Sequence, residues 1–338
     1  MFTIACVQSA HAQAPNEPLY NDLSKTLGFI MGQRFTLNRI KAEYPTLSLQ
    51  VQITELQFKA TFGTAEKKIE KLLKNLLKEK YTEYVATLEK KLQTSLKSQE
   101  ITQETAVKFL DEVAERAKGN IPSPMLETLL NYEFEERPSD EFIRGFKATY
   151  RTKGHPKAKG LDFQIEYPKS WSLREGKRPN IIQVFSSNNG RGPASALIMT
   201  RDLIKEAQRE LTREEIKALK TLEGSKEIAS ELFSESGLRE MAKGMGMTNV
   251  RNITTKKMVL DRWPGAMLEF LSDQQRLDLT LTIYNRTYLV IYKNYMIFLQ
   301  CHVAKLPDDT EDTLKTKISK FESLFHLMAN SLVIQSQY

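Results

Sequence analysis

Residues 163–171, FQIEYPKSW, decide the fold of the second half of this chain. Phe163, Ile165 and Tyr167 alternate with polar residues, and a period of two is typical of a half-buried β-strand. Pro168 has no backbone N–H to give to a strand ladder, so the strand is expected to end there. The stretch therefore predicts a sheet domain in which it is the first strand.

Downstream of this strand, apolar runs and tight turns predict an antiparallel sheet. Residues 181–185 and 196–200 are the next expected strands, and the Gly-containing segment 187–193 between them is expected to be a hairpin loop. A phosphate-binding loop would have to lead from a strand into a helix, so this segment does not predict one. Charged helices are expected to follow between residues 203 and 245.

The last third of the chain repeats this pattern and then ends in a helix. Four more strands are expected: 259–271, 277–283, 288–292 and 295–303. The turn signal Trp263-Pro264-Gly265 lies inside the first, and residues 284–286 and 293–294 are expected turns between the others. A final amphipathic helix starts near Glu311, and its apolar face must lie on the sheet. A sheet covered by helices is an α+β architecture.

The opening stretch resembles the FxIxYPxxW start of PsbP-like domains, a group that includes the DcrB-type bacterial lipoproteins. The similarity spans about residues 158–338. It implies a twisted antiparallel sheet with helices on both faces. The resemblance implies no shared catalytic residues, and members of the family mostly bind or support other proteins.

Aromatic residues of this half are candidates for a binding face, since tyrosine and tryptophan combine an apolar ring with a polar group. The candidates are Trp171, Trp263, Tyr284, Tyr288 and Tyr292. Packing within the sheet would explain the same five residues equally well.

The first half of the chain is rich in amphipathic helices. Apolar residues recur every three or four positions over residues 19–40 and again over 69–96. The second stretch predicts one continuous helix of about 30 residues, roughly 45 Å long. Residues 47–62 fit either a strand or a helix. A further helix is expected to start at Thr102 and to end near Gly119.

These patterns divide the chain into a helical domain over residues 17–150, a linker over 151–160 and the PsbP-like domain over 161–338. The linker prediction rests on the sequence RTKGHPKAKG, which has the Gly, Pro and charge of an exposed connector. Its four cations are not interleaved with aromatic residues, so it does not predict a nucleic-acid partner.

Three short motifs of the helical half resemble the N-terminal domain of FKBP-type macrophage infectivity potentiator proteins: LGFIMGQ at 27–33, ATFG at 60–63 and AVKFLDE at 106–112. In that family this domain forms a homodimer and binds other proteins in a chaperone-like way. The resemblance makes these residues candidates for dimer contacts: Leu27, Gly28, Ile30, Met31 and Gly32. A self-contained helical hairpin is the alternative. The pattern of the FKBP proline pocket does not follow, so isomerase activity is not implied.

Residues 1–12 have features of a signal-peptide remnant. MFTIACV is short and apolar, and Ala10-His11-Ala12 fits the small-x-small pattern of a signal peptidase site. A basic n-region is missing, and an ordinary frayed terminus is the alternative. Ile4-Ala5-Cys6 is faintly similar to a lipoprotein box, which would place a lipid anchor on Cys6. A cleaved leader predicts a periplasmic or secreted protein of the bacterial envelope.

Composition and motifs argue against several classes of function. The net charge of +7 is spread over surfaces that mix Lys with Glu, which favours a solvated surface over a nucleic-acid partner. The sequence contains no run of about 18 apolar residues, so it predicts no transmembrane segment. The four histidines lack further ligands at metal spacing, and no GxSxG, HExxH or Walker motif occurs. We therefore expect no catalytic residues, no metal and no cofactor.

Two hypotheses for the function follow. The first is a non-enzymatic, exported envelope protein that dimerises and binds or assists other proteins. The second is a small-molecule or lipid carrier that uses a pocket of the α+β domain, between the sheet and the final helix.

Overall fold

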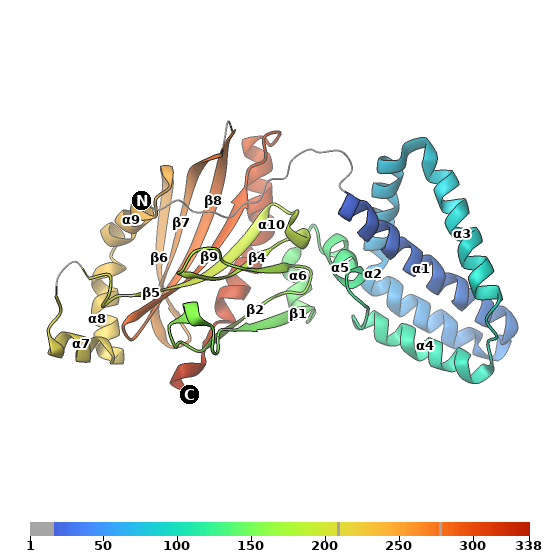
Figure 1. Ribbon diagram of the computed structural model, residues 1–338, viewed down its shortest axis with the longest axis horizontal. Helices are drawn as coiled ribbons and strands as arrows, with labels where there is room; N and C mark the ends of the chain where they lie inside the picture. Colours follow the sequence, from blue (N-terminus) through green and yellow to red (C-terminus); the bar gives the residue numbers. More distant parts are fainter. Residues whose placement is uncertain (1–16, 208–209, 277–278) are drawn as a thin grey trace. The chain divides into compact units, whose positions relative to one another are not determined.

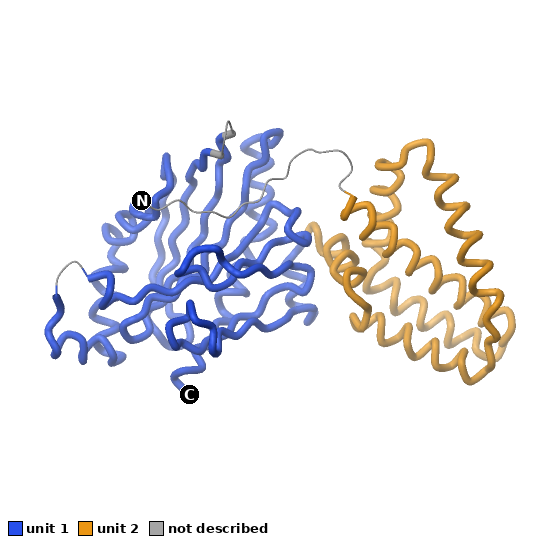
Figure 2. The backbone as a smooth tube through the Cα atoms, in the orientation of Figure 1, with its two compact units in different colours: residues 1–10, 137–338 blue, residues 11–136 orange. Residues whose placement is uncertain are grey.

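A computed structural model describes residues 17–207, 210–276 and 279–338 of the chain. The chain divides into two compact units, a helical unit that ends at Glu136 and an α/β unit that begins at Arg137 (Figure 2). The predicted leader, residues 1–12 with Cys6, lies outside the described residues.

The described residues of the helical unit form five α-helices. Their bounds are α1 Glu17–Glu43, α2 Ser48–Leu77, α3 Tyr81–Lys97, α4 Gln103–Ala117 and α5 Met125–Glu133. A capping box of Thr102 and Thr105 starts α4 at the predicted residue. Leu23, Phe62 and Val113, from α1, α2 and α4, are fully buried, and α2 packs against both other helices.

The ambiguous segment 47–62 is helical and forms the first half of α2. Val51, Phe58 and Phe62 are buried, and their spacing matches the helical period. The competing alternation included Leu49 and Ile53, which are both exposed. Burial of one side of a helix therefore overrides the short alternating pattern.

The long helix predicted over 69–96 is wrong, because the chain breaks it in the middle. α2 ends at Leu77, a short 3-10 turn covers Lys78–Lys80, and α3 starts at Tyr81. Lys78 has a φ of 50°, which a continuing helix cannot contain. The break lets α3 turn back along α1 (Figure 1), so that the apolar stripe of α3 packs on a helix of the same chain.

The boundary between the units lies earlier than predicted, and residues 151–160 are not a linker. The strand β1, Lys147–Arg151, already pairs with β2, Phe163–Pro168. Thr152 is fully buried, and its hydroxyl donates to the carbonyl of Leu161 and accepts from the N–H of Phe163. The Gly and Pro residues of this segment therefore shape a tight connection inside the α/β unit.

The α/β unit contains two antiparallel sheets. Three strands pair in the order β1-β2-β10, and seven pair in the order β3-β4-β5-β9-β8-β7-β6. The remaining strands are β3 Ser172–Glu175, β4 Ile181–Ser186, β5 Ala194–Asp202, β6 Thr248–Leu260, β7 Trp263–Arg276, β8 Leu279–Tyr292, β9 Tyr295–Ala304 and β10 Val333–Ile334. The helices are α6 Pro138–Ile143, α7 Arg213–Leu219, α8 Leu222–Leu232, α9 Glu235–Gly244 and α10 Glu311–Asn330.

Of the predicted turns, 284–286 is wrong, and 187–193 and 293–294 are confirmed. The segment Trp263-Pro264-Gly265 begins strand β7, so the turn expected from it lies just before these residues. Residues 284–286 are part of strand β8. Their side chains alternate as in a strand: Tyr284 and Arg286 lie over one face of the sheet, and Asn285 is buried on the other. Segment 187–193 does join two strands, β4 and β5. The chain also turns between Leu260 and Trp263, and again between Tyr292 and Tyr295.

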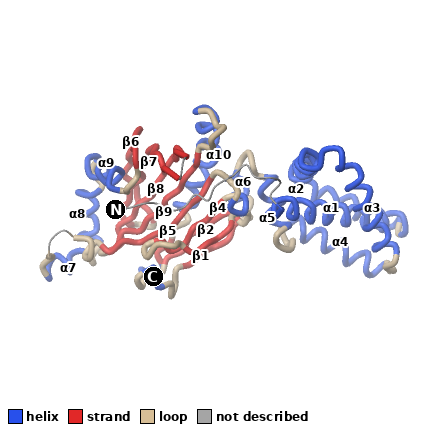
Figure 3. Tube along the Cα trace, turned by 45° about the horizontal axis from the view of Figure 1, so that its top comes forward, coloured by secondary structure: helices blue, strands red, loops and turns tan. Residues whose placement is uncertain are grey.

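The large sheet has a helical layer on each face (Figure 3). On one face, α10 packs together with the small sheet on a core that includes Phe163, Phe185 and Phe325. On the other face, α8 and α9 cover a second core that includes Phe233 and Phe298. The α+β architecture, with helices on both faces of a twisted antiparallel sheet, is confirmed.

Candidate functional site

Three large apolar side chains of α2 lie exposed in one row. The exposed fractions are 68% for Leu49, 47% for Ile53 and 66% for Leu56. Steps of four and three residues place them on one face of the helix, away from the face that is buried in the core. Exposed Ala60 continues the row after a further four residues. We call these four residues the α2 stripe.

The glycine pair predicted to make dimer contacts is in contact with α3 of the same chain. A Cβ atom on Gly28 would lie 3.8 Å from Leu88 Cδ1, and one on Gly32 would lie 3.6 Å from Leu92 Cδ2. These distances are ordinary van der Waals contacts, so the two leucines occupy the space beside the glycines. The close approach that the two glycines permit is therefore made within the chain.

The other predicted dimer residues lie nearby on α1. Leu27 and Ile30 are buried in the helical core, and Met31 is half-buried. The predicted set is thus split between the core and the contact with α3. Dimerisation through these five residues stays a prediction.

The five aromatic candidates for a binding face are all buried in the core beneath α10. The set is Trp171, Trp263, Tyr284, Tyr288 and Tyr292, and none is more than 8% exposed. Trp171 packs edge-on against Phe321 of α10. These five side chains therefore pack inside the core and do not form an exposed binding face. A carrier pocket between the sheet and the final helix stays a prediction.

A buried ion-pair network joins the sheet to α10. Arg286 of β8 is paired with Glu269 of the neighbouring strand β7, and its Nη2 lies 2.6 Å from Glu322 Oε1 on α10. Tyr284 donates its hydroxyl to Glu269 at 2.8 Å. Burial by itself would raise the pKa of Glu269, but this hydrogen bond and the charge of Arg286 outweigh it and lower the pKa. The guanidinium of Arg286, paired with carboxylates on both elements, therefore links α10 to the sheet.

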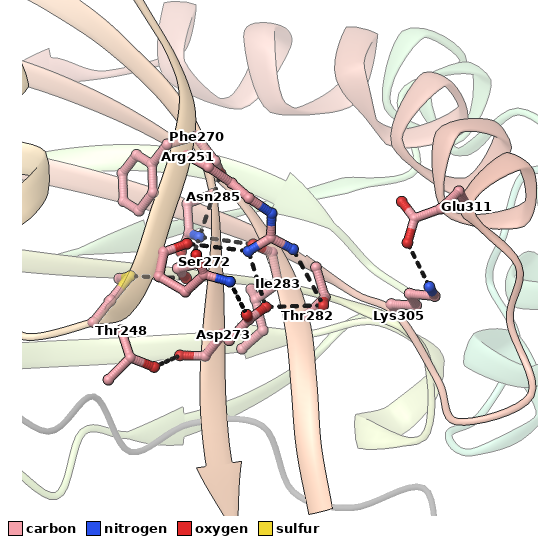
Figure 4. Close-up of polar contacts among 12 residues, drawn as sticks. Thr248, Arg251, Phe270, Ser272, Asp273, Thr282, Ile283, Asn285, Lys305 and Glu311 are labelled. Carbon is pink, nitrogen blue, oxygen red and sulfur yellow. Dashed lines mark hydrogen bonds and ion pairs between the residues drawn. The ribbon is translucent and has the colours of Figure 1, made fainter.

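A second polar network fixes the start of the edge strand β6 (Figure 4). Asp273 of β7 accepts hydrogen bonds from Asn249 at 2.5 Å, Arg251 at 3.1 Å and Thr282 at 2.9 Å. The register between β6 and β7 shifts on both sides of Arg251. These three donors outweigh the effect of burial and lower the pKa of the Asp273 carboxyl. The side chain of Asp273 thus helps to hold the bulged start of β6 in place.

The lone described cysteine and its neighbouring histidine are both buried. Cys301 is fully buried in the core under α10, and burial raises the pKa of its thiol. Burial lowers the pKa of His302 to about 4, so this imidazole is neutral at pH 7. Neighbouring strand residues point to opposite faces, which separates the two side chains. Within the described residues, no three His, Cys, Asp or Glu side chains gather as metal ligands would.

Glu141 of α6 is a buried carboxyl group that was not predicted from the sequence. It is 2% exposed, and it accepts hydrogen bonds from the backbone N–H and the hydroxyl of Ser170, at 2.8 and 2.7 Å. Burial raises its pKa to about 7, although both hydrogen bonds act in the opposite direction. The contact fastens α6 to the turn after β2. A Glu in a short charged segment carries no local signal that predicts its burial.

A cavity of about 570 Å³ lies on the face of the sheet opposite α10. Its floor is apolar and includes Leu219 of α7, Leu232 of α8, Met241 of α9 and Met296 of β9. Gly224 allows α7 and α8 to meet closely, since a Cβ there would lie 2.0 Å from the carbonyl oxygen of Ala218. The lining comes from the three consecutive helices α7, α8 and α9 and from the strands β5 and β9, so no single motif could predict it.

Comparison with known proteins returns structural neighbours only. No protein-family model and no curated protein matches the sequence. The solution structure of a cyanobacterial PsbP from Synechocystis sp. PCC 6803 has 13% identity and a TM-score of 0.34, and the match covers 56% of this chain and 92% of that one. The sequence resemblance had indicated the same PsbP family.

Two crystal structures are also similar. Protein PA94 from Pseudomonas aeruginosa, of unknown function, has 13% identity, a TM-score of 0.26, and coverage of 56% of this chain and 97% of its own. LpqN of Mycobacterium tuberculosis, described as involved in cell envelope biogenesis, has 9% identity, a TM-score of 0.28, and coverage of 58% and 96%. At these values the likeness carries no argument about activity. The resemblance of the helical half to macrophage infectivity potentiator proteins stays a prediction.

The described helices give no candidate for a membrane span: none combines sufficient length with sufficient hydropathy. The features with functional potential are therefore the α2 stripe of the helical unit and the cavity beside α7 and α8. Each lies within one unit.

Proposed function

We propose that the protein is a non-enzymatic envelope protein that associates with other proteins, a second copy of itself included, through its helical unit. The observation that carries this proposal is the exposure of Leu49, Ile53 and Leu56 on one face of α2. Contiguous exposed apolar surface of this kind marks interaction sites on soluble proteins. The small-x-small pattern at residues 10–12 supports export to the envelope.

The spacing of the α2 stripe favours a second copy as its partner. Its four residues are separated by steps of four, three and four, so the order of steps is the same in both directions along the helix. Two antiparallel copies of α2 can thus place Ile53 against Leu56 and Leu49 against Ala60, as a two-fold axis requires. Only Glu55 and Lys59 are charged between Ser48 and Ala60, and they pair with each other at 2.7 Å. No like charges would meet across this contact.

The test is the mass of the protein in solution. We expect sedimentation velocity to show reversible dimerisation in the micromolar to submillimolar range, because a contact of this size is small for a stable dimer. The double variant Ile53→Lys/Leu56→Lys is expected to be a monomer with unchanged helical content. Val259, 67% exposed in the α/β unit, provides the matched control. Val259→Lys should dimerise like the wild type, and a wild-type protein that is a monomer throughout this range would refute the proposal.

A second candidate function is that of a small-molecule carrier. The cavity beside α7 and α8 supports it, since its volume lies within the range of ligand pockets and its floor is apolar. The cavity is on the opposite face of the sheet from the position predicted from the sequence. Which ligand it would take depends on the charges at its rim.

A further inference from the structure

The rim of the cavity beside α7 and α8 is acidic, although the chain as a whole has a net charge of +7. Among the described residues, the charged side chains that line it belong to one arginine and four glutamates: Arg201, Glu206, Glu215, Glu227 and Glu231. Acidic side chains around an apolar floor attract a ligand of the opposite charge.

Two of these carboxylates are engaged within the protein. Glu206 lies 3.7 Å from Arg201, whose guanidinium also stacks 5.3 Å from the ring centre of Phe298. Glu215 accepts the N–H of Thr212 at 2.7 Å as part of the capping box that starts α7. The arginine and both of these glutamates therefore already serve the fold.

The other two carboxylates, Glu227 and Glu231, are exposed on α8 one helical turn apart. Among the described residues, neither has an ion-pair partner. Glu223 extends the same row by one turn in the other direction but does not line the cavity. Like charges at a spacing of four residues repel each other and destabilise a helix slightly. A cation bound beside Glu227 and Glu231 would relieve this repulsion.

We propose that this cavity binds a small amphipathic cation, with its apolar part on the floor of Leu219, Leu232 and Met296 and its cationic group beside Glu227 and Glu231. The inference rests on the second candidate function and adds the chemical class of the ligand. A volume of about 570 Å³ holds a molecule of this size but not a helix or a protein domain.

The test compares three probes with the same tail and different head groups, each below its micelle concentration. Dodecyltrimethylammonium is cationic, dodecyl sulfate is anionic, and dodecyldimethylamine oxide is uncharged in mildly alkaline buffer. Isothermal titration calorimetry on the full chain should show the cation binding about tenfold more tightly than the sulfate, as two partly exposed carboxylates allow. The uncharged probe should lie between them.

Three variants locate the site. Glu227→Gln/Glu231→Gln should remove the preference for the cation and leave the affinity for the uncharged probe unchanged. Glu223→Gln makes the same chemical change one turn outside the cavity and should leave the preference intact. Ala218→Trp places a large side chain in the cavity from an exposed position and should abolish binding of all three probes.

The outcomes separate the inference from the function on which it rests. Equal affinities for the three probes, lost in Ala218→Trp, would support a carrier and overturn the cationic class. Tighter binding of the sulfate would overturn it as well. Absence of binding, or binding that Ala218→Trp leaves intact, would overturn both the inference and the carrier function.

Discussion

The helices α3 and α10 share the same spacing of apolar residues but differ in how deeply they are buried. Both carry apolar residues every three or four positions, as a surface helix does. None of the 17 residues of α3 is buried, whereas six residues of α10 are buried, and Leu324 and Phe325 are fully buried. Amphipathicity alone therefore does not decide how deeply a helix packs.

The surface that receives each helix explains the difference. α10 packs against strands of both sheets and against α6, so its apolar side chains contact more than one element. α3 packs mainly on α1, with a smaller contact to α2, and Gly28 and Gly32 of α1 leave room for the ends of Leu88 and Leu92. A helix that packs mainly on one other helix buries less of each side chain than one that packs on two sheets and a helix. We infer that α10 stabilises its unit much more than α3 does.

Truncation of one large side chain in each helix tests this difference most directly. Phe325→Ala should destabilise the α/β unit by about 4 kcal/mol, because it leaves a cavity in a fully buried core. Leu88→Ala should cost the helical unit only about 1 kcal/mol, since Leu88 is half-buried. Urea unfolding can follow the α/β unit by the fluorescence of Trp171 and Trp263, the two tryptophans of the chain. Far-UV circular dichroism follows both units. Equal costs would contradict the comparison.

The ion-pair network under α10 provides a second and smaller test. Arg286→Met leaves the carboxylate of Glu269 without its cation, and we expect a loss of about 3 kcal/mol. Glu322→Gln changes the partner on α10, which is 53% exposed, and should cost less than about 1 kcal/mol. The unfolding midpoint in urea, again read by tryptophan fluorescence, measures both. A larger loss for Glu322→Gln would show that α10 depends on the exposed pair and not on the buried one.

The pH dependence of stability tests how α6, which packs beside α10, is held. Glu141 has a folded pKa of about 7, above its ordinary value of 4.5, so the folded protein binds this proton more tightly than the unfolded chain does. Its contribution to stability is therefore complete below about pH 4.5 and is lost as the pH rises through about 7. The loss should amount to about 2–3 kcal/mol.

Glu141→Gln is uncharged at every pH and should not show this loss. The difference in unfolding free energy between wild type and variant, measured in urea at about pH 5 and about pH 8, isolates the effect from other titrating groups. The variant should gain stability relative to the wild type on going to the higher pH. A difference that does not change with pH would show that the carboxyl is not held in its neutral form.

The sequence predicted those parts of the fold in which local pattern and burial agree. The strand at 163–168 and the final helix from Glu311 show one period, and both formed as predicted. The prediction failed at Lys78, where the apolar stripe continues on both sides of the break. Only the position of α1, a tertiary feature, makes the break favourable. It also failed at 284–286, where Asn and Arg resemble a turn but are buried in polar networks.

The candidate sites were harder to predict than the fold. The residues of the α2 stripe were visible in the sequence, but only the structure shows that the opposite face of α2 is buried and this one is not. The five aromatic residues had the composition of a binding face and lie instead in the core. The cavity is lined by residues from 201 to 296, which only the sheet and its covering helices bring together.

The bulged strand β6 has a consequence for how the α/β unit avoids aggregation. It is the last strand of the large sheet in the described part of the chain, and it is 13 residues long. A long, flat strand at a sheet edge is a template on which another chain can add a strand. The two register shifts beside Arg251 interrupt that template, and Lys256 and Lys257 add charge to it. The edge is therefore protected against strand addition.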